Sequence, residues 1–241
     1  MGYGDLFTLW SDYGPFNEEL IRIYASEITY ALGYIHSCGI AYRDMKLENV
    51  LLDLYGHIQI ADFGFAKELN ENQRTKTICG TLQYMAPEVA RGEPYGKEVD
   101  WWALGILLYI LYTNRYPFPN AGVQKHSDLR FDNYTRPSWG RSLDDFLDRL
   151  LVVEKSNRMC TFEEVHQHSF FSSVKWQDVP ARYQDPFVYI NRTNQHSHRS
   201  NRSPHSDVDR LETLDEDWSA FDEQYEFGDG EYFDEPMPTL P

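Results

Sequence analysis

The sequence predicts a mainly α-helical domain with one small β-hairpin, and three patterns along the chain support this fold class. Apolar residues recur at three- and four-residue steps over 17–38, as they do along one face of a helix. A nearly uninterrupted apolar run lies further along, within 97–112. Between these segments, two short apolar runs at 49–52 and 58–60 flank a turn-like linker. We therefore expect helices to make up most of the fold.

The elements can be justified in chain order. Asn17 followed by two glutamates is typical of a helix start, and Gly39 is typical of a helix stop. Residues 53–56 contain turn formers, so the two short apolar runs should pair as a hairpin. The 97–112 helix is apolar all round, which indicates a helix buried in the middle of the domain. The remaining expectations are a mostly irregular stretch at 63–96 and further helices at 143–151 and 161–168.

Charge and composition suggest three parts. Residues 207–241 hold 13 Asp and Glu and one Arg, a net −12, which leaves −4 of the chain's −16 for residues 1–206. Residues 191–206 are polar without an apolar face, as in disordered linkers. We expect a folded body over 1–187, a disordered linker over 188–206, and an acidic tail with scattered aromatic residues after it. We expect no nucleic-acid partner, although the acidity belongs to the tail and by itself says little about function.

The cysteines and the hydropathy pattern bear on location. Three cysteines, Cys38, Cys79 and Cys160, are an odd number at unrelated spacings, which argues against a disulfide framework and a zinc site. They fit a reducing compartment. We expect the cytoplasm, with the nucleus as a second location. No run of 18 apolar residues occurs, so no membrane span is expected.

The chemistry is concentrated in a charged loop and the hairpin that follows it. Alone, the loop over 42–49 fits a solvated loop of mixed charge. The hairpin, however, could bring Asp62 back beside Asn49. A carboxylate and an amide oxygen together suit Mg²⁺. Lys46 and Asp44 would then supply a cation for a γ-phosphate and a base that orients an attacking hydroxyl.

Three motifs carry a resemblance to protein kinases. Tyr42-Arg43-Asp44 with Asn49, Asp62-Phe63-Gly64 and Ala86-Pro87-Glu88 resemble the catalytic loop, the metal-binding motif and the end of the activation segment, in order and at kinase spacing. The resemblance covers about residues 4–187. It implies the C-terminal lobe of a kinase domain, a helical bundle with a small hairpin and an activation segment.

The resemblance assigns a role to each matching residue of the catalytic centre. It implies that Asp44 is the catalytic base and that Lys46 binds the γ-phosphate. It further implies that Thr81 helps fix both side chains and favours a hydroxyl acceptor. Asn49 and Asp62 would be the metal-binding residues. The implied cofactors are ATP and Mg²⁺, and a lysine two places after the aspartate is the serine/threonine-kinase pattern.

Six further positions match the family. Leu51 resembles the apolar floor under adenine, and Asp5 the acidic position that meets the ribose or a substrate arginine. Glu48 matches a second position that grips basic substrates. Three others resemble structural positions of kinases. Asp100 matches a carboxylate that braces the catalytic loop. Glu88 and Arg158 match an ion pair that ties the activation segment to the body.

The subgroup implied is the AGC kinases, closest to the ribosomal protein S6 kinase-related group. Thr77 resembles the threonine that takes the activating phosphate in these kinases, and Arg43 and Lys67 match the positions that would grip it. The implied partners are an upstream activating kinase and protein substrates with a Ser or Thr acceptor and basic residues before it.

The family's N-terminal lobe has no counterpart in the 241 residues. Neither a Gly-X-Gly-X-X-Gly loop nor a strand lysine with its partner glutamate precedes the first motif. We therefore expect residues 1–241 alone to bind Mg-ATP weakly and to transfer little or no phosphate. Three explanations stay open: a fragment or truncated gene model of an active kinase, a natural short form that acts as a catalytically silent interaction module, or a chain without a stable fold.

Overall fold

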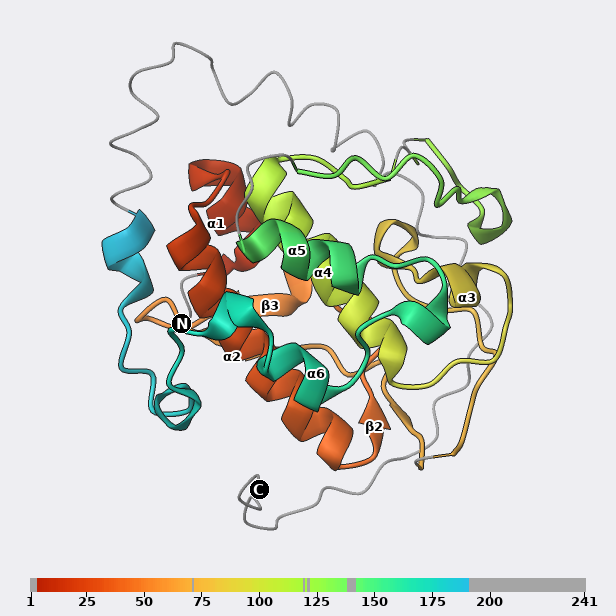
Figure 1. Cartoon of the computed structure of the whole chain (residues 1–241), viewed down its shortest axis with the longest axis horizontal. Helices are drawn as coiled ribbons and strands as arrows, with labels where there is room; N and C mark the ends of the chain where they lie inside the picture. The colour runs from red at the N-terminus through yellow and green to blue at the C-terminus, as the bar shows by residue number, and fades with distance from the viewer. Residues whose placement is uncertain (1–3, 71, 119, 121, 138–141, 191–241) are drawn as a thin grey trace. The chain divides into compact units, whose positions relative to one another are not determined.

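The computed structural model places helices around a small β-structure (Figure 1). The chain divides into two units, 1–200 and 201–241, and all described residues belong to the first. The described residues are 4–70, 72–118, 120, 122–137 and 142–190. The expected acidic tail therefore lies outside them, as does the linker apart from its first three residues.

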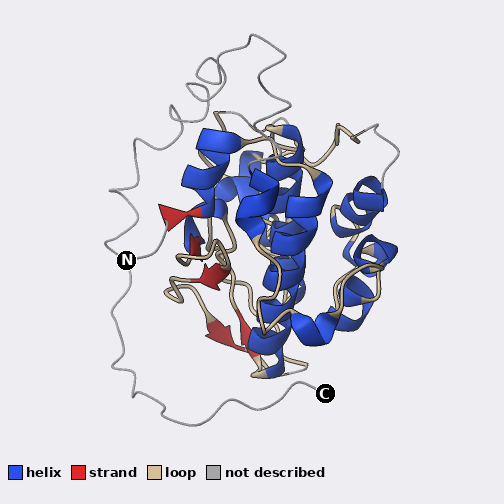
Figure 2. Cartoon of the chain, turned by 90° about the vertical axis from the view of Figure 1, so that its left-hand side faces the viewer, coloured by secondary structure: helices blue, strands red, loops and turns tan. Residues whose placement is uncertain are grey.

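The numbered α-helices are α1 (Leu6–Tyr13), α2 (Glu18–Ser37), α3 (Pro87–Ala90), α4 (Glu98–Thr113), α5 (Ser142–Leu150) and α6 (Phe162–His166). A further helical segment covers 186–190, so the first three residues of the predicted linker are helical. The strands are β1 (Gly4–Asp5), β2 (Ile40–Ala41), β3 (Val50–Leu52), β4 (Ile58–Ile60) and β5 (Lys67–Glu68). Figure 2 shows the strands gathered on one side of the helices. Six 3₁₀ helices complete the described elements: η1 (Leu47–Asn49), η2 (Leu82–Tyr84), η3 (His126–Asp128), η4 (Lys155–Asn157), η5 (Ser169–Phe171) and η6 (Trp176–Asp178).

The hairpin predicted from the sequence is β3–β4, and β1 joins it in a three-stranded antiparallel sheet. The strand order is β1-β3-β4, with Leu51 opposite Gln59 and Asp5 opposite Leu51. A second, two-stranded sheet pairs β2 with β5. This second sheet was not predicted, because each of its strands is only two residues long and carries no periodicity of its own.

The predicted first helix is confirmed as α2. The Asn17 side chain accepts a hydrogen bond from the backbone N–H of Leu20 at 2.9 Å, which caps the start of the helix. The helix packs on α4 and α6. At Gly33 it lies so close to Phe162 that a Cβ would be 2.4 Å from the ring, so the approach of α6 requires glycine.

The predicted buried helix is confirmed as α4. Every residue from Val99 to Tyr112 is buried, because α2, α5 and η2 surround the helix. It ends at Asn114, which takes the left-handed conformation with φ 60°. No helix among the described residues is both long and apolar enough to cross a bilayer.

Two further predicted helices are confirmed, and the short helix α1 was not predicted. The helices expected at 143–151 and 161–168 are α5 and α6, and α6 starts with a capping box between Thr161 and Glu164. The short helix α1 was not expected. It is held by burial of Leu6, Leu9 and Trp10 against its neighbours rather than by a long periodic pattern.

Residues 63–96 are mostly irregular, as expected. They also contain three short elements: β5, η2 and α3.

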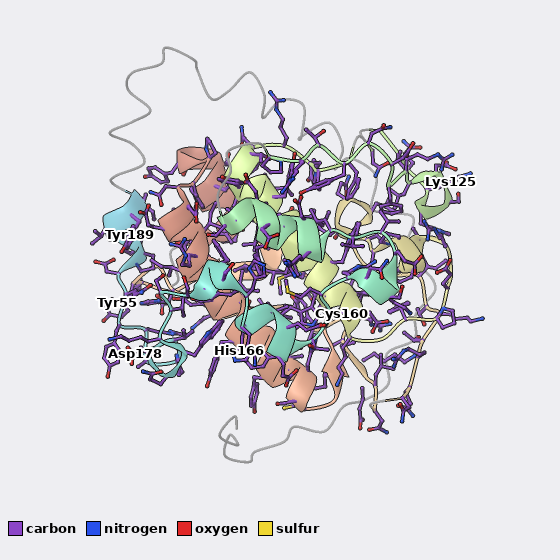
Figure 3. The ribbon with its side chains drawn as sticks, viewed as in Figure 1. Tyr55, Lys125, Cys160, His166, Asp178 and Tyr189 are labelled. Carbon is purple, nitrogen blue, oxygen red and sulfur yellow. The ribbon has the colours of Figure 1, made fainter. Side chains whose placement is uncertain are left out.

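A segment near the end of the described chain covers the hairpin turn. The Arg182 guanidinium lies 2.6 Å from the Asp53 carboxylate, and the Phe187 ring covers Gly56, where a Cβ would be 3.1 Å from the ring. In Figure 3, Tyr55 of the turn and Tyr189 of this segment lie on the same side of the molecule. These contacts fix the hairpin from outside.

Candidate active site

The centre of the site is the buried carboxylate of Asp44, which three polar side chains surround. Asn49 donates to its Oδ2 at 2.7 Å, and the Lys46 Nζ lies 3.2 Å from the same oxygen. The Thr81 hydroxyl donates to the Oδ1 at 3.1 Å. The Lys46 Nζ also donates to the Thr81 oxygen at 3.3 Å, which closes the network. Four residues separated by up to 37 positions therefore share one hydrogen-bonded cluster.

The loop that carries Asp44 is held in a conformation unusual for its sequence. Arg43 has φ 70°, a region that non-glycine residues rarely adopt. The Asp100 carboxylate, fully buried at the start of α4, accepts from the backbone N–H groups of Tyr42 and Arg43 at 2.9 and 2.7 Å. His36 contacts the same carboxylate at 2.7 Å. Charge-assisted hydrogen bonds to one side chain thus offset the strain of the loop.

The hairpin brings Asp62, which follows β4, back to the start of β3, next to Asn49. The N–H of Ala61 donates to the backbone oxygen of Asn49 at 2.9 Å, so Asp62 follows directly on this pairing. Asp62 is exposed, has φ 53°, and accepts from the N–H of Gly64 through Oδ1 at 3.0 Å. The Tyr42 hydroxyl donates to the Ala61 oxygen, and burial and the Asp44 charge raise the pKa of Tyr42, which keeps the donor protonated.

The residues at this edge fit a hard divalent cation. The Asn49 amide donates through its nitrogen to the Asp44 side chain and backbone oxygen, and its oxygen is the atom of the amide that could bind a cation. The Asp62 carboxylate is exposed and keeps one oxygen free of the Gly64 N–H. One amide oxygen and one carboxylate are the ligand types Mg²⁺ takes together with phosphate oxygens. These two residues would hold the metal.

The residues expected around the nucleotide lie next to one another. Asp5 pairs with Leu51 in the sheet, and the Leu51 side chain is 38% exposed. The Asp5 carboxylate also caps α1, accepting from the Thr8 N–H at 2.7 Å. Glu48 is exposed on η1, between Lys46 and Asn49 in sequence but outside the Asp44 cluster.

Behind the Asp44 cluster lies a cavity of about 20 Å³, lined by Thr81 and Asp100 among others, which has room for about one water molecule. This cavity is too small to hold a nucleotide.

Thr77 lies in a network around the activation segment. Its hydroxyl is 3.2 Å from the hydroxyl of Thr75, which accepts from the Lys67 Nζ at 3.1 Å. The Tyr95 hydroxyl donates to the Thr77 backbone oxygen and accepts from Arg43 at 3.2 Å. Arg43 and Lys67 thus reach the surroundings of Thr77, each through an intermediate side chain.

Sequence reasoning missed these intermediates. Thr75 and Tyr95 pair with each other as an isolated β-bridge, and both are buried. Burial raises the pKa of Tyr95, so the phenol remains a donor to the activation segment. No local sequence pattern predicts the role of Tyr95, because this role depends on its pairing with Thr75, 20 positions earlier.

Glu88 and Arg158 form a buried bidentate ion pair. The two guanidinium nitrogens contact the two carboxylate oxygens at 2.7 and 2.9 Å, and both side chains are almost fully buried. The guanidinium also lies over the Trp102 ring at 4.7 Å and donates to the Val152 oxygen. The pair ties α3, at the end of the activation segment, to the helical body.

The chain resembles known proteins over most of its length. Residues 1–171 match the family model described as protein kinase domain. A putative serine/threonine-protein kinase of Caenorhabditis elegans is 43% identical over 188 residues, which cover 78% of this chain and 43% of the relative. The mouse cAMP-dependent protein kinase catalytic subunit PRKX is 40% identical over 195 residues (76% of this chain, 53% of the relative).

The human ribosomal protein S6 kinase-related protein is 38% identical over 194 residues (78% of this chain, 47% of the relative). The chain thus spans about half the length of the curated relatives it matches.

Proposed function

Because the chain belongs to the protein kinase family, we propose that the protein is an ATP-dependent serine/threonine kinase of the AGC group. The observation that supports this proposal is the hydrogen-bonded cluster of Asp44, Lys46, Asn49 and Thr81, with Asp62 at the adjoining hairpin end. A scaffold has no chemical need for this complete set. Its charges and oxygens suit the transfer of a phosphoryl group from Mg-ATP to a hydroxyl.

The cluster suggests how each side chain acts. The Asp44 carboxylate orients the acceptor hydroxyl and takes its proton, while the hydroxyl oxygen bonds to the γ-phosphorus and the bond from that phosphorus to the bridging oxygen of ADP breaks. The Lys46 ammonium stabilises the charge on the transferred group. Mg²⁺, when bound, neutralises charge on the phosphates. Thr81 and Asn49 hold the carboxylate in place by donating to its two oxygens.

We also propose finer features of the same function. The described residues form the C-terminal lobe, and residues 1–241 by themselves bind Mg-ATP weakly, because a second lobe covers the nucleotide in complete kinases. An upstream kinase phosphorylates Thr77, and Asp5 and Glu48 favour substrates with basic residues before the acceptor. The protein acts in the cytoplasm or nucleus. The odd number of cysteines, at unrelated spacings, supports a reducing compartment.

The test is phosphoryl transfer by the full-length product of the gene, with radiolabelled ATP and a Ser/Thr peptide that carries upstream arginines. Asp44→Asn should lower the rate constant about 10²- to 10⁴-fold, the range that a positioned base contributes. Asp12→Asn is the matched control, since Asp12 is exposed on α1, away from the cluster, and should leave the rate unchanged. Transfer that persists in Asp44→Asn would contradict the proposal. If the phosphorylated wild type transfers no phosphate, the remaining explanation is that the protein is a catalytically silent interaction module.

A further inference from the structure

The surface next to α3 contains a groove that the proposed reaction does not use. Its volume is about 790 Å³, and it lies between the activation segment, the end of α3 and the loop around η3. Pockets of about 300–1,000 Å³ can hold a drug-sized molecule, so several peptide side chains fit here. In the orientation shared by Figures 1 and 3, α3 and Lys125, the residue before η3, lie at the same end of the molecule.

The floor of the groove is apolar and well supported. Leu129 is buried, and Phe131 packs edge-on against Trp102 with ring centroids 5.7 Å apart. Ile78 and Val153 complete this floor. The Arg158 guanidinium also contacts the Val153 backbone oxygen at 3.4 Å, so the floor is anchored to the buried ion pair.

The rim of the groove carries positive charge that has no carboxylate partner within the described part of the chain. Arg91 is exposed at the end of α3, and Arg130 is exposed beyond η3. The Arg130 guanidinium donates only to the backbone oxygens of Asp128 and Leu129, at 3.2 Å each. By contrast, five other arginines each form an ion pair: Arg22, Arg136, Arg149, Arg158 and Arg182.

The backbone of the rim is fixed before any partner arrives. Asn120 accepts from the Arg130 N–H at 2.8 Å and donates to its carbonyl oxygen at 2.9 Å. The His126 Nδ1 donates to the Ala90 oxygen at 2.9 Å and ties η3 to the end of α3. A groove whose walls are held together by such bonds loses little entropy when it binds a partner.

From these observations we propose that this groove is a docking site for an acidic segment of a partner protein, one that carries a leucine or an aromatic residue between Asp or Glu residues. The apolar side chain fits the floor of Leu129, Phe131 and Val153, and the carboxylates pair with Arg91 and Arg130. The two arginines outnumber the single lining carboxylate, Asp132, so the charge of the groove complements an acidic peptide. Arginine at the rim of an apolar floor is also the composition that protein interfaces favour.

The docking site is separate from phosphoryl transfer, because none of its residues belongs to the Asp44 cluster. Peptide binding can therefore be measured whether or not the protein transfers phosphate. A failure of the catalytic proposal and a failure of the docking proposal are then distinguishable.

The experiment uses the complete 241-residue chain and a fluorescein-labelled peptide of about ten residues, in which one Leu and one Phe lie among Asp and Glu. We expect saturable binding with a Kd below about 1 mM. In methyl NMR spectra the peptide should shift the signals of Ile78, Leu129 and Val153. A peptide with Lys in place of the acids, and one with Ser in place of Leu and Phe, should each bind at least about tenfold more weakly.

Two protein variants and one control locate the contact. Arg91→Ala and Arg130→Gln should each weaken binding about 3- to 10-fold, and higher salt should weaken the wild-type interaction. Arg115→Ala, a matched change at an exposed arginine outside the groove, should leave the Kd unchanged. Each variant is first checked for an unchanged melting temperature, and Arg130→Ala replaces Arg130→Gln if that variant melts early.

Three outcomes would overturn the proposal. One is equal binding of the acidic and the basic peptide. Another is a Kd that neither arginine variant changes, or peptide shifts confined to methyl groups outside the groove. The last is sedimentation showing that the wild type dimerises and that the arginine variants do not, which would make a second copy of the chain the occupant.

Discussion

At the scale of single residues, Asp100 shows how one buried carboxylate can organise a site. Its two oxygens accept from two consecutive backbone N–H groups and contact His36. This arrangement holds Arg43 at positive φ and so sets the direction in which Asp44 leaves the loop. A carboxylate outside the Asp44 cluster can thus determine where the Asp44 side chain points.

The Glu88–Arg158 pair gives the first prediction about stability. Arg158→Met should lower the free energy of unfolding by about 3–5 kcal/mol, because it leaves the Glu88 carboxylate buried and unpaired. Urea denaturation measures the loss. Arg149→Met is the matched control: Arg149 is 61% exposed and contacts Asp145 at 3.2 Å, so its loss should cost less than about 1 kcal/mol. Similar losses in both variants would show that burial does not determine how much an ion pair contributes to the free energy of unfolding.

At the scale of elements, the β3–β4 hairpin depends on contacts that lie far from it in sequence. Glu27 of α2 contacts the His57 Nδ1 at 2.6 Å and accepts from the Ile58 N–H at 2.9 Å. Burial raises the pKa of Glu27, and these hydrogen bonds oppose that rise. Arg182 and Phe187 also cover the turn. The hairpin between Asn49 and Asp62 is therefore held by α2 and by the segment that contains Arg182 and Phe187.

Two glycines allow this packing to be tested. Gly56 and Gly122 have similar left-handed φ values, 81° and 76°, so Ala strains the backbone at either position by about 1–2 kcal/mol. A Cβ at Gly56 would also lie 3.1 Å from the Phe187 ring, whereas a Cβ at Gly122 meets nothing within 4 Å. Gly56→Ala should thus destabilise by about 1–3 kcal/mol more than Gly122→Ala in urea denaturation.

Phe187→Leu added to Gly56→Ala should remove part of this extra loss, because the shorter side chain leaves room for the methyl group. Equal losses for the two single variants would mean that Phe187 does not press on the turn.

The same elements show what the sequence could predict. The cap at Asn17, the turn after Asp53 and the buried α4 follow from local chemistry, and each was located within a residue or two. Helix α1, the β2–β5 pair and the role of Tyr95 were not foreseen, because tertiary contacts rather than local patterns fix them. The residues of the Asp44 cluster were named from motifs, while their mutual hydrogen bonds required the coordinates.

At the scale of the whole molecule, stability should depend on pH through His168. The Nδ1 of this ring accepts from the Phe170 N–H at 3.2 Å, and the Nε2 lies 3.0 Å from Asp145, so the neutral ring fits the fold. Burial lowers the pKa of His168, although Asp145 opposes the shift. A lowered pKa means that the unfolded chain binds more protons, so the free energy of unfolding falls as the pH drops below about 6.5.

The measurement is the urea midpoint between about pH 7.5 and 5.5. His168→Asn keeps an acceptor for the Phe170 N–H and does not titrate, so its midpoint should fall less than that of the wild type. At the upper pH the variant should already have the lower midpoint, because Asn loses the packing of the ring on Phe146, so the comparison is between the two pH slopes. A wild-type midpoint that falls no more steeply than that of the variant would exclude His168 as a source of the acid sensitivity.

The burial of α4 has a consequence for how the folded unit opens. Its backbone N–H groups are covered on all sides, so solvent deuterium cannot reach them through fraying of a single neighbouring element. Exchange at Leu104 to Leu108 then requires the disassembly of the surrounding helices. The slowest-exchanging amides of this unit should therefore lie in α4, and their protection should measure its global unfolding equilibrium.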